Sequence, residues 1–461
     1  MTDRVQRSLS RMWFALAIGS LVLAGILAAL LVIARVPPFH DWITDPLFFK
    51  RCLVVHVDLS LFVWFSAFLM FLYSRLPRDP HFLAQEIAAI ACAITGVMMM
   101  VIAAGMPAST PILSNYLPVI DHPLFLGGLV AFATGIGLQV LQPRLIPDQS
   151  STETRLPEVA QLGLRAAGIA ILFAVITIWA AWWQTSRALG PSTYFELLFW
   201  GGGHVFQFAN TCGMLVAWTA LTAFATGKTP CSRRTAFALF AWLLLPVFAA
   251  PLLTLAGTGT TLYRTAFTAM MQWGIFPVVL VFLALCFRRF WQTRHQRDST
   301  YRIIRLGFAS SVTLTLLGFG LGAMIRGSNT LVPAHYHANI GAVTCAYMTL
   351  TFAILAELGY HIKSIRLLNW SRWQPAAFGL GQAVFAAGFG LAGAYGMGRK
   401  LYGSEQAIHS TAASVGLVVM GIGGLMAIVG GIAYLTVSLH AMAHADQDDT
   451  APVGEKQIAT I

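Results

Sequence analysis

The chain has 461 residues, of which 57% are hydrophobic and only 10% are charged, and its formal net charge is +11. This composition excludes an ordinary soluble globular protein, in which roughly a quarter of the residues are charged. The basic residues lie at the ends of apolar segments rather than on one exposed face, so the positive charge does not indicate nucleic-acid binding.

Apolar runs long enough to span a membrane recur along the whole chain, since about 20 helical residues cross ~30 Å of hydrocarbon. In chain order the sequence predicts about twelve such helices, at Met12–Arg35, Phe48–Arg75, Leu83–Gly105, His122–Gln142, Ala160–Ser186, Ser192–Thr226, Arg234–Leu255, Leu262–Phe287, Ile304–Ile325, Val332–Leu358, Pro375–Tyr395 and His409–His440. No break between them is long enough for a soluble domain. Residues 1–461 are therefore predicted to form a single all-α integral membrane domain, with residues 443–461 as a flexible cytoplasmic tail.

The distribution of Lys and Arg predicts how the chain is oriented, because cytoplasmic loops retain positive charge. With the N-terminus inside, most of the 29 Lys and Arg residues fall on one side of the membrane. We therefore expect a multi-pass protein of the bacterial inner (cytoplasmic) membrane with both termini in the cytoplasm. The six cysteines lie singly, and without a CxxC pair they indicate neither a disulfide framework nor a thiolate metal site.

Four of the twelve histidines lie inside predicted helices, where a polar side chain is costly and therefore marks a candidate functional site. They are His56, His204, His335 and His337, in the outer halves of the second, sixth and tenth helices, so a shared site is predicted. His335 and His337 are about 200° apart around the helix axis and cannot hold one metal ion. Each can instead ligate a different haem iron.

A His-x-His on the tenth of twelve helices, with a histidine near the outer end of the second, resembles subunit I of the haem–copper oxidase superfamily. The resemblance implies a subunit I-like fold and two haems, which we take to be b-type. It implies that His56 and His337 are the axial ligands of a low-spin haem. It also implies that His335 is the proximal ligand of a high-spin haem.

Two further motifs carry the same resemblance. Residues Phe199–Val205 are similar to the family's Trp-x-x-Gly-His on helix six, whose histidine, here His204, is a distal copper ligand. Residues Gly396–Tyr402 are similar to a basic pair that binds haem propionates, which implies that role for Arg399 and Lys400. Carboxylates at the membrane edge favour charge-assisted bonds to such side chains.

The chain departs from the family at the distal metal site. The family's two adjacent histidines at the end of helix seven are missing, because no histidine lies between His204 and His295. The pair would fall near Leu252 and Leu253. A copper or non-haem iron ion needs about three or four ligands, so one imidazole does not predict a conventional distal metal site.

Three other polar residues lie near His204 in the sequence. Glu196, two turns earlier, is a candidate proton relay, a metal ligand or a helix-end anchor. Gln207 and Asn210 can offer an oxygen to a metal or a bound ligand, although such side chains in membrane helices mostly bond to other helices.

Two functions follow from these features. The first is a terminal reductase in which an outer-face donor, a cytochrome c or a cupredoxin, supplies electrons through the low-spin haem. A small gas, O2 or NO, is then reduced at the high-spin haem, with His204 on its distal side. The alternative is a non-catalytic di-haem cytochrome that transfers electrons or senses a gas and has lost the copper site. A transporter is disfavoured, because the sequence lacks broken-helix repeats; the expected partners are membrane lipid and an electron-donor subunit, not nucleic acid.

Overall fold

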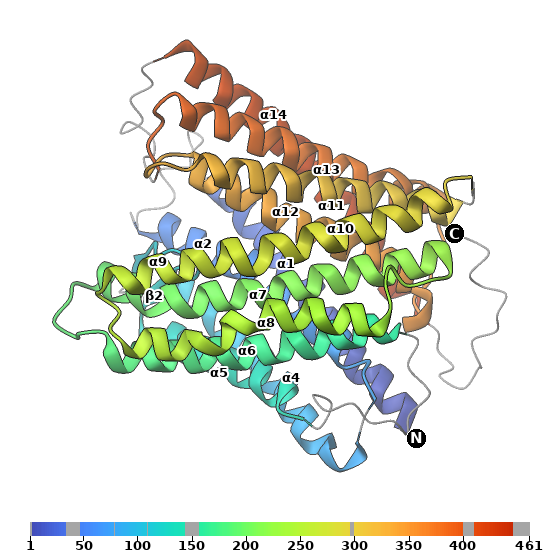
Figure 1. Cartoon of the computed structure of the whole chain (residues 1–461), viewed down its shortest axis with the longest axis horizontal. Helices are drawn as coiled ribbons and strands as arrows, with labels where there is room; N and C mark the ends of the chain where they lie inside the picture. Colours follow the sequence, from blue (N-terminus) through green and yellow to red (C-terminus); the bar gives the residue numbers. More distant parts are fainter. Residues whose placement is uncertain are drawn as a thin grey trace. The chain divides into compact units, whose positions relative to one another are not determined.

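The computed structural model describes residues 2–33, 47–77, 79–107, 109–142, 156–295, 299–399 and 410–445, which are almost entirely helical (Figure 1). The helices are α1 (Thr2–Ile33), α2 (Phe48–Val57), the π-helical η2 (Asp58–Val63), α3 (Trp64–Tyr73), the 3-10 turn η3 (Pro80–Phe82), α4 (Leu83–Ala104), α5 (Pro123–Val140), α6 (Glu158–Gln184), α7 (Pro191–Thr226), α8 (Arg233–Leu255), α9 (Thr261–Met270), the π-helical η5 (Met271–Ile275), α10 (Phe276–Gln292), α11 (Ser299–Met324), α12 (Leu331–Ile354), the 3-10 turn η6 (Ala356–Leu358), α13 (Ile365–Ala394) and α14 (Thr411–Ala443). A short hairpin pairs β1 (Thr110–Ile112) with β2 (Val119–Asp121), with Thr110 opposite Asp121.

Each of the twelve predicted membrane helices corresponds to one long helical segment, because α2, η2 and α3 run on without a break, as do α9, η5 and α10. Within the described part of the chain, eleven segments are long and apolar enough to cross a membrane. The segment outside this set is α12, which carries His335, His337 and Asn339 in its first half. The predicted fold class, an all-α integral membrane protein, is confirmed.

The two largest errors in the predicted helix boundaries have the same cause. Helix α1 begins at Thr2 rather than Met12, and α13 begins at Ile365 rather than Pro375. In each case a polar stretch continues the helix beyond the apolar run that the prediction detected. Pro375 lies inside α13, as membrane helices tolerate. Its own carbonyl oxygen also accepts from the Cys345 thiol of α12 at 3.4 Å.

The described residues form two compact units. The first contains residues up to Val216 together with Cys231–Val281. In it, α1 packs on α2, η2 and α3, α4 packs on α5, and α6 packs on α8. Helices α4 and α5 approach closely at two glycines, since a Cβ on Gly96 would lie 2.5 Å from the carbonyl oxygen of Gly128. Small residues at such contacts are typical of helix packing in membranes.

The second unit contains Ala217–Pro230 and the residues from Phe282 onwards. Its longest contact joins α13 and α14, which run side by side at the orange and red end of the chain (Figure 1). Glycines again make the contact, because a Cβ on Gly388 would lie 2.4 Å from the backbone nitrogen of Met420. Helix α12 packs between α11 and α13, so its two histidine-bearing faces have different neighbours.

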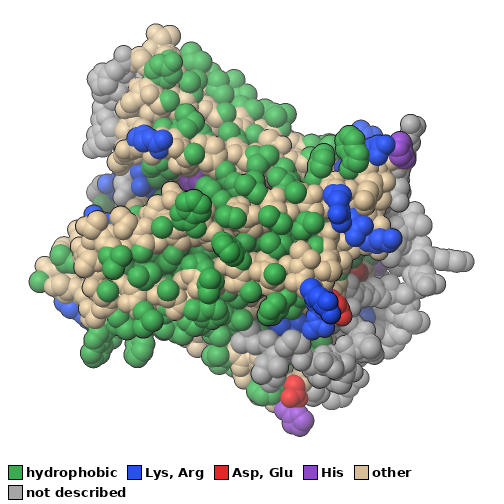
Figure 2. Space-filling view, in the orientation of Figure 1, with side chains coloured by type: hydrophobic (Ala, Val, Ile, Leu, Met, Phe, Trp, Pro, Cys, Tyr) green, Lys and Arg blue, Asp and Glu red, His purple; other side chains and the backbone are tan. Residues whose placement is uncertain are grey.

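The visible surface is largely apolar along the helices, with basic side chains near helix ends (Figure 2). Helix α8 shows the pattern most clearly. Its exposed large side chains recur at helical spacing and are Phe237, Trp242, Leu245, Phe248, Leu252 and Leu255. Arg233 and Arg234 are exposed at the start of the same helix. An apolar stripe with basic residues at its end is typical of a helix that faces lipid.

Candidate functional site

His56 lies at the end of α2, and a neighbouring helix holds its ring. The Nδ1 atom is 2.8 Å from the carbonyl oxygen of Ala24 on α1. A carbonyl only accepts hydrogen bonds, so Nδ1 carries the proton and Nε2 keeps its lone pair. The π-helical segment η2 begins two residues later at Asp58, which is 2% exposed and whose carboxyl oxygens have no hydrogen-bond partner among the described residues.

His335, on α12, is held in the same way. Its Nδ1 atom lies 2.7 Å from the carbonyl oxygen of Gly318 on α11, so Nδ1 is again the protonated nitrogen. The ring lies directly against α11, because a Cβ on Gly322 would be 2.7 Å from Nδ1. Asn339, one turn further along α12, donates from Nδ2 to the carbonyl oxygen of His335 at 3.0 Å. Gly322 therefore makes room for the imidazole, and Gly318 orients it through its carbonyl oxygen.

His337 contacts a different helix. Its ring centroid is 4.5 Å from that of Phe385 on α13, and the residue is exposed. His335 contacts α11, so the prediction that these two histidines point to opposite sides of α12 is confirmed.

Arg399 follows α13 in the chain and lies beside the His-Tyr-His sequence. Its guanidinium carbon is 5.6 Å from the centre of the Tyr336 ring, between the two histidines in sequence. Its backbone N–H donates to the carbonyl oxygen of Ser328 at 3.4 Å, just before α12. The predicted basic residue is thus close to the start of the histidine helix. Lys400, the other member of the predicted pair, lies outside the described residues.

His204 is buried in α7, with 4% of its surface exposed, and follows three glycines. Each glycine allows a close approach: Gly201 meets Tyr263 and Phe267, Gly202 meets Ile178 and Gly203 meets Tyr116. The glycine run thus lets neighbouring side chains reach the backbone of α7 beside the histidine.

Both ring nitrogens of His204 are hydrogen-bonded. Nδ1 lies 2.6 Å from the carbonyl oxygen of Trp200, one turn earlier on α7. Nε2 lies 2.8 Å from the hydroxyl of Tyr116, which comes from the loop between β1 and β2. The Trp200 and Tyr116 rings also contact the imidazole, with centroid distances of 4.8 and 4.6 Å.

A second tyrosine hydroxyl inserts into the hydrogen-bond ladder of α7 one turn before His204. The Tyr263 hydroxyl accepts from the backbone N–H of Gly201 at 2.9 Å and donates to the carbonyl of Leu197 at 3.0 Å. Those two groups are the i and i−4 partners of an α-helix. A side chain inserted at such a pair is a recognised cause of local helix distortion.

Glu196 binds the loop that carries Tyr116. The backbone N–H of Asn115 donates to Glu196 Oε2 at 2.8 Å, and the Asn115 side-chain amide donates to Oε1. From α2, the fully buried Arg51 donates to the carbonyl oxygens of Ala104 at 3.0 Å and Ser109 at 3.3 Å, where the chain enters the hairpin. The hairpin is therefore fastened at its loop and at the point where the chain enters it.

The remaining residues named from the sequence contribute little to the surroundings of His204. Leu252 is 71% exposed and so faces away from the interior of its unit. Gln207 and Asn210 bond to each other, with Asn210 Nδ2 donating to Gln207 Oε1 at 3.3 Å. Among the described residues, no group of three or more His, Cys, Asp and Glu side chains is placed to hold a metal ion.

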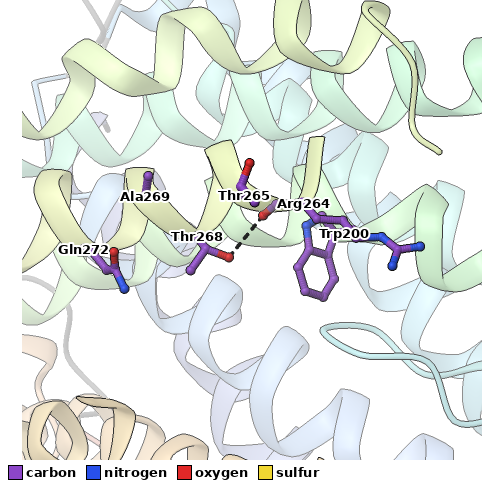
Figure 3. A pocket seen from close by; sticks show the side chains of 6 residues that line it. All are labelled: Trp200, Arg264, Thr265, Thr268, Ala269 and Gln272. Carbon is purple, nitrogen blue, oxygen red and sulfur yellow. Dashed lines mark hydrogen bonds between the residues drawn. The ribbon is translucent and has the colours of Figure 1, made fainter. Parts of the chain in front are cut away.

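An open cavity of about 380 Å³ lies beside Trp200. Figure 3 shows its lining, in which Arg264, Thr265, Thr268 and Ala269 come from α9 and Gln272 comes from η5. The Thr268 hydroxyl donates to the carbonyl oxygen of Arg264 at 3.1 Å. Trp200 borders both this cavity and His204.

Sequence reasoning identified the histidines but missed the residues that orient them. Tyr116, Ala24 and Gly318 are far from their histidine partners in sequence and have no pattern that marks them. Gly322 belongs to a small-residue spacing with Gly318 that is common in membrane helices. Trp200 was visible within the motif, but its carbonyl, not its ring, is the hydrogen-bonding group.

Two curated proteins and one solved structure illustrate what the chain is similar to. It is 33% identical over 361 residues to an uncharacterised protein of Aquifex aeolicus (strain VF5), covering 76% of this chain and 86% of that protein. It is 24% identical to an uncharacterised protein of Rickettsia prowazekii (strain Madrid E), covering 93% and 95%. No family model matches. The fold is that of a heme-copper terminal oxidase solved as a dimer, with a TM-score of 0.70, 15% identity and coverage of 97% of this chain and 86% of that one.

Proposed function

The chain belongs to the same family as the uncharacterised Aquifex aeolicus protein, and we propose that it is a di-haem subunit of a membrane respiratory oxidoreductase. In this proposal His56 and His337 are the axial ligands of a low-spin haem, and His335 is the proximal ligand of a high-spin haem. Arg399 and Lys400 bind haem propionates. The proposal rests on the residue pattern, on the terminal-oxidase fold and on the local geometry of the histidines.

The observation that carries the proposal is the arrangement shared by His56 and His335. Each donates from Nδ1 to a backbone carbonyl of an adjacent helix, at 2.8 and 2.7 Å. Histidines that ligate a metal almost always donate their other ring N–H to a carboxylate, carbonyl or water, which fixes the tautomer and the ring orientation. In each histidine Nε2 is thus the ring atom that fits haem iron, and in His335 the Asn339 side-chain nitrogen lies 3.4 Å from that atom and would have to release it.

The environment of α12 supports the remaining assignments. His337 lies on the side opposite His335, against the aromatic ring of Phe385, as two separate haem ligands on one helix require. Arg399 reaches the Tyr336 ring between them, so a guanidinium lies near the end of the histidine helix. A haem propionate accepts charge-assisted hydrogen bonds from such a group.

The haems would supply one-electron transfer and, at an iron with an open position, binding and reduction of a small gas. The gas is O2 or NO, and the electrons come from a cytochrome c or cupredoxin partner at the outer face of the bacterial inner membrane. The protein orients the imidazoles, binds the propionates and places His204 on the distal side. Glu196 has the anchoring role in this proposal, because Asn115 donates two hydrogen bonds to its carboxylate.

One observation favours the alternative, a di-haem cytochrome that transfers electrons or senses a gas without reducing it. The Tyr116 hydroxyl binds Nε2 of His204, the atom that a distal metal would need. Multiple-turnover assays with a reduced cytochrome c or cupredoxin donor separate the two functions. Consumption of O2 or NO supports the reductase, whereas gas binding to the reduced protein without consumption supports the alternative.

Optical and EPR spectra of the purified protein test the di-haem assignment itself. We expect two haems per chain, one low-spin and one that binds CO after reduction. His335→Ala should remove the CO-binding haem, and His56→Ala or His337→Ala should remove the low-spin signal. Wild-type protein that retains no haem after expression with haem supplied would refute the assignment.

A further inference from the structure

Both ring nitrogens of His204 take part in hydrogen bonds, so neither is available to a metal ion without breaking one of them. Trp200 offers a carbonyl oxygen 2.6 Å from Nδ1, and a carbonyl can only accept a hydrogen bond. Nδ1 therefore carries the proton. In a neutral imidazole Nε2 is then an acceptor, so the Tyr116 hydroxyl, 2.8 Å away, is the donor.

We propose that His204 and Tyr116 form a hydrogen-bonded pair in place of a distal metal site, and that His204 binds neither copper nor non-haem iron. The placement of this pair on the distal side of the high-spin haem rests on the proposed function. The pair itself lies within the first unit and depends only on contacts made there. It assigns to Tyr116 the role of a positioning residue, which fixes the tautomer and the orientation of His204.

The backbone at Tyr116 is strained in a way that favours a functional role. Its φ angle is 64°, and Tyr116 is the only described residue other than glycine with a positive φ. The left-handed region is a genuine outlier for a bulky side chain and persists only where surrounding contacts enforce it. Such strain clusters at functional sites, and here it directs the phenol at His204.

The surrounding contacts that enforce this conformation come from α7 itself. Gly203 leaves the space that the Tyr116 ring fills, since a Cβ there would be 2.5 Å from both Cβ and Cγ of Tyr116. Glu196 binds the adjacent residue Asn115 through its backbone and its side chain. The helix that carries His204 thus also carries the glycine and the carboxylate that hold its partner.

A metal ion at His204 would require three changes that the contacts oppose. The Nε2 lone pair must be released from the Tyr116 hydroxyl, and the ring of Tyr116 must leave its position against Gly203. Further ligands must then be recruited, because one imidazole does not hold copper or iron. The donor set around His204 therefore fits a hydrogen-bonding role and does not fit a metal site.

The experiment uses full-length protein with ¹⁵N-labelled histidine in lipid bilayers, studied by solid-state NMR. His204→Ala identifies the His204 signals by their loss. Tyr116→Phe removes only the proposed donor, and Tyr263→Phe is the matched control, because its hydroxyl binds the backbone of α7 and not the imidazole. Each sample is recorded alone, with equimolar Cu²⁺ and with equimolar Fe²⁺.

We expect His204 to be a neutral Nδ1–H tautomer with a hydrogen-bonded Nε2. Tyr116→Phe should move the Nε2 resonance towards the value of a free acceptor, Tyr263→Phe should leave it in place, and neither metal should broaden it. An Nε2 resonance unchanged in Tyr116→Phe would overturn the proposal. So would one equivalent of tightly bound copper or iron that is lost in His204→Ala. Optical spectra of the same samples report haem content, so failure of the proposed function is seen separately.

Discussion

A single methyl group on α11 should displace the proposed high-spin haem. In Gly322→Ala the new Cβ would lie 2.7 Å from Nδ1 and 2.8 Å from Cε1 of His335, closer than real Cβ contacts allow. The imidazole must withdraw by several tenths of an ångström, which breaks the 2.7 Å bond from Nδ1 to the carbonyl of Gly318. Loss of such an orienting bond typically lowers metal affinity by about 10–100-fold. We expect retention of the CO-binding haem to fall by that order.

Helix α11 also supplies a matched control. Gly320 is two residues away, and a Cβ there meets nothing within 4 Å, so Gly320→Ala should keep both haems. It should also stabilise the helix by about 0.5–1 kcal/mol, because alanine loses less backbone entropy than glycine. Haem content by pyridine haemochrome, CO difference spectra and thermal unfolding compare the two variants. Full CO binding in Gly322→Ala would refute the view that the Gly318 carbonyl orients a haem ligand.

Two further substitutions test the anchoring and the propionate assignments. Glu196→Gln should lower the free energy of unfolding by about 1.5–3 kcal/mol in denaturant titrations. The reason is that Gln has one acceptor oxygen, whereas Asn115 now donates to two carboxylate oxygens. Unchanged stability would contradict the anchoring role. Arg399→Gln should weaken haem retention about tenfold or more in competition with an apo-globin, since a charge-assisted hydrogen bond contributes about 1.5–3 kcal/mol. Arg326→Gln is the control, because among the described residues the Arg326 side chain donates to the helix-end carbonyls of Ala323 and Ile325. It should not weaken haem retention, and equal losses in both variants would argue against a specific propionate contact.

Membrane helices were predictable because length and apolarity are strong signals along one chain. The errors fell where helices continue into polar residues, as at the start of α1 and at Ile365, since hydrocarbon thickness limits the apolar run and not the helix. The opposite facing of His335 and His337 was equally predictable, because it follows from helix geometry alone.

The contacts that orient the histidine rings and fix their tautomers were not predictable from the sequence. Tyr116 binds His204 from a hairpin loop 88 residues away in the chain, and no periodicity relates the two. Ala24 and Gly318 act through backbone carbonyls, which every residue possesses and no motif marks. The glycines before His204 were visible as a motif, yet their meaning, space for Tyr116, Ile178 and Tyr263, depends on tertiary packing.

The central proposal is that His56, His335 and His337 ligate two haems. The most direct measurement is quantitative haem analysis with reduced-plus-CO optical spectra on wild-type protein and the three single alanine variants, each checked for intact folding. The account predicts two haems in the wild type, loss of the CO-binding haem in His335→Ala, and loss of the other in His56→Ala and in His337→Ala. Folded wild-type protein without haem, or variants that all keep both haems, would contradict it.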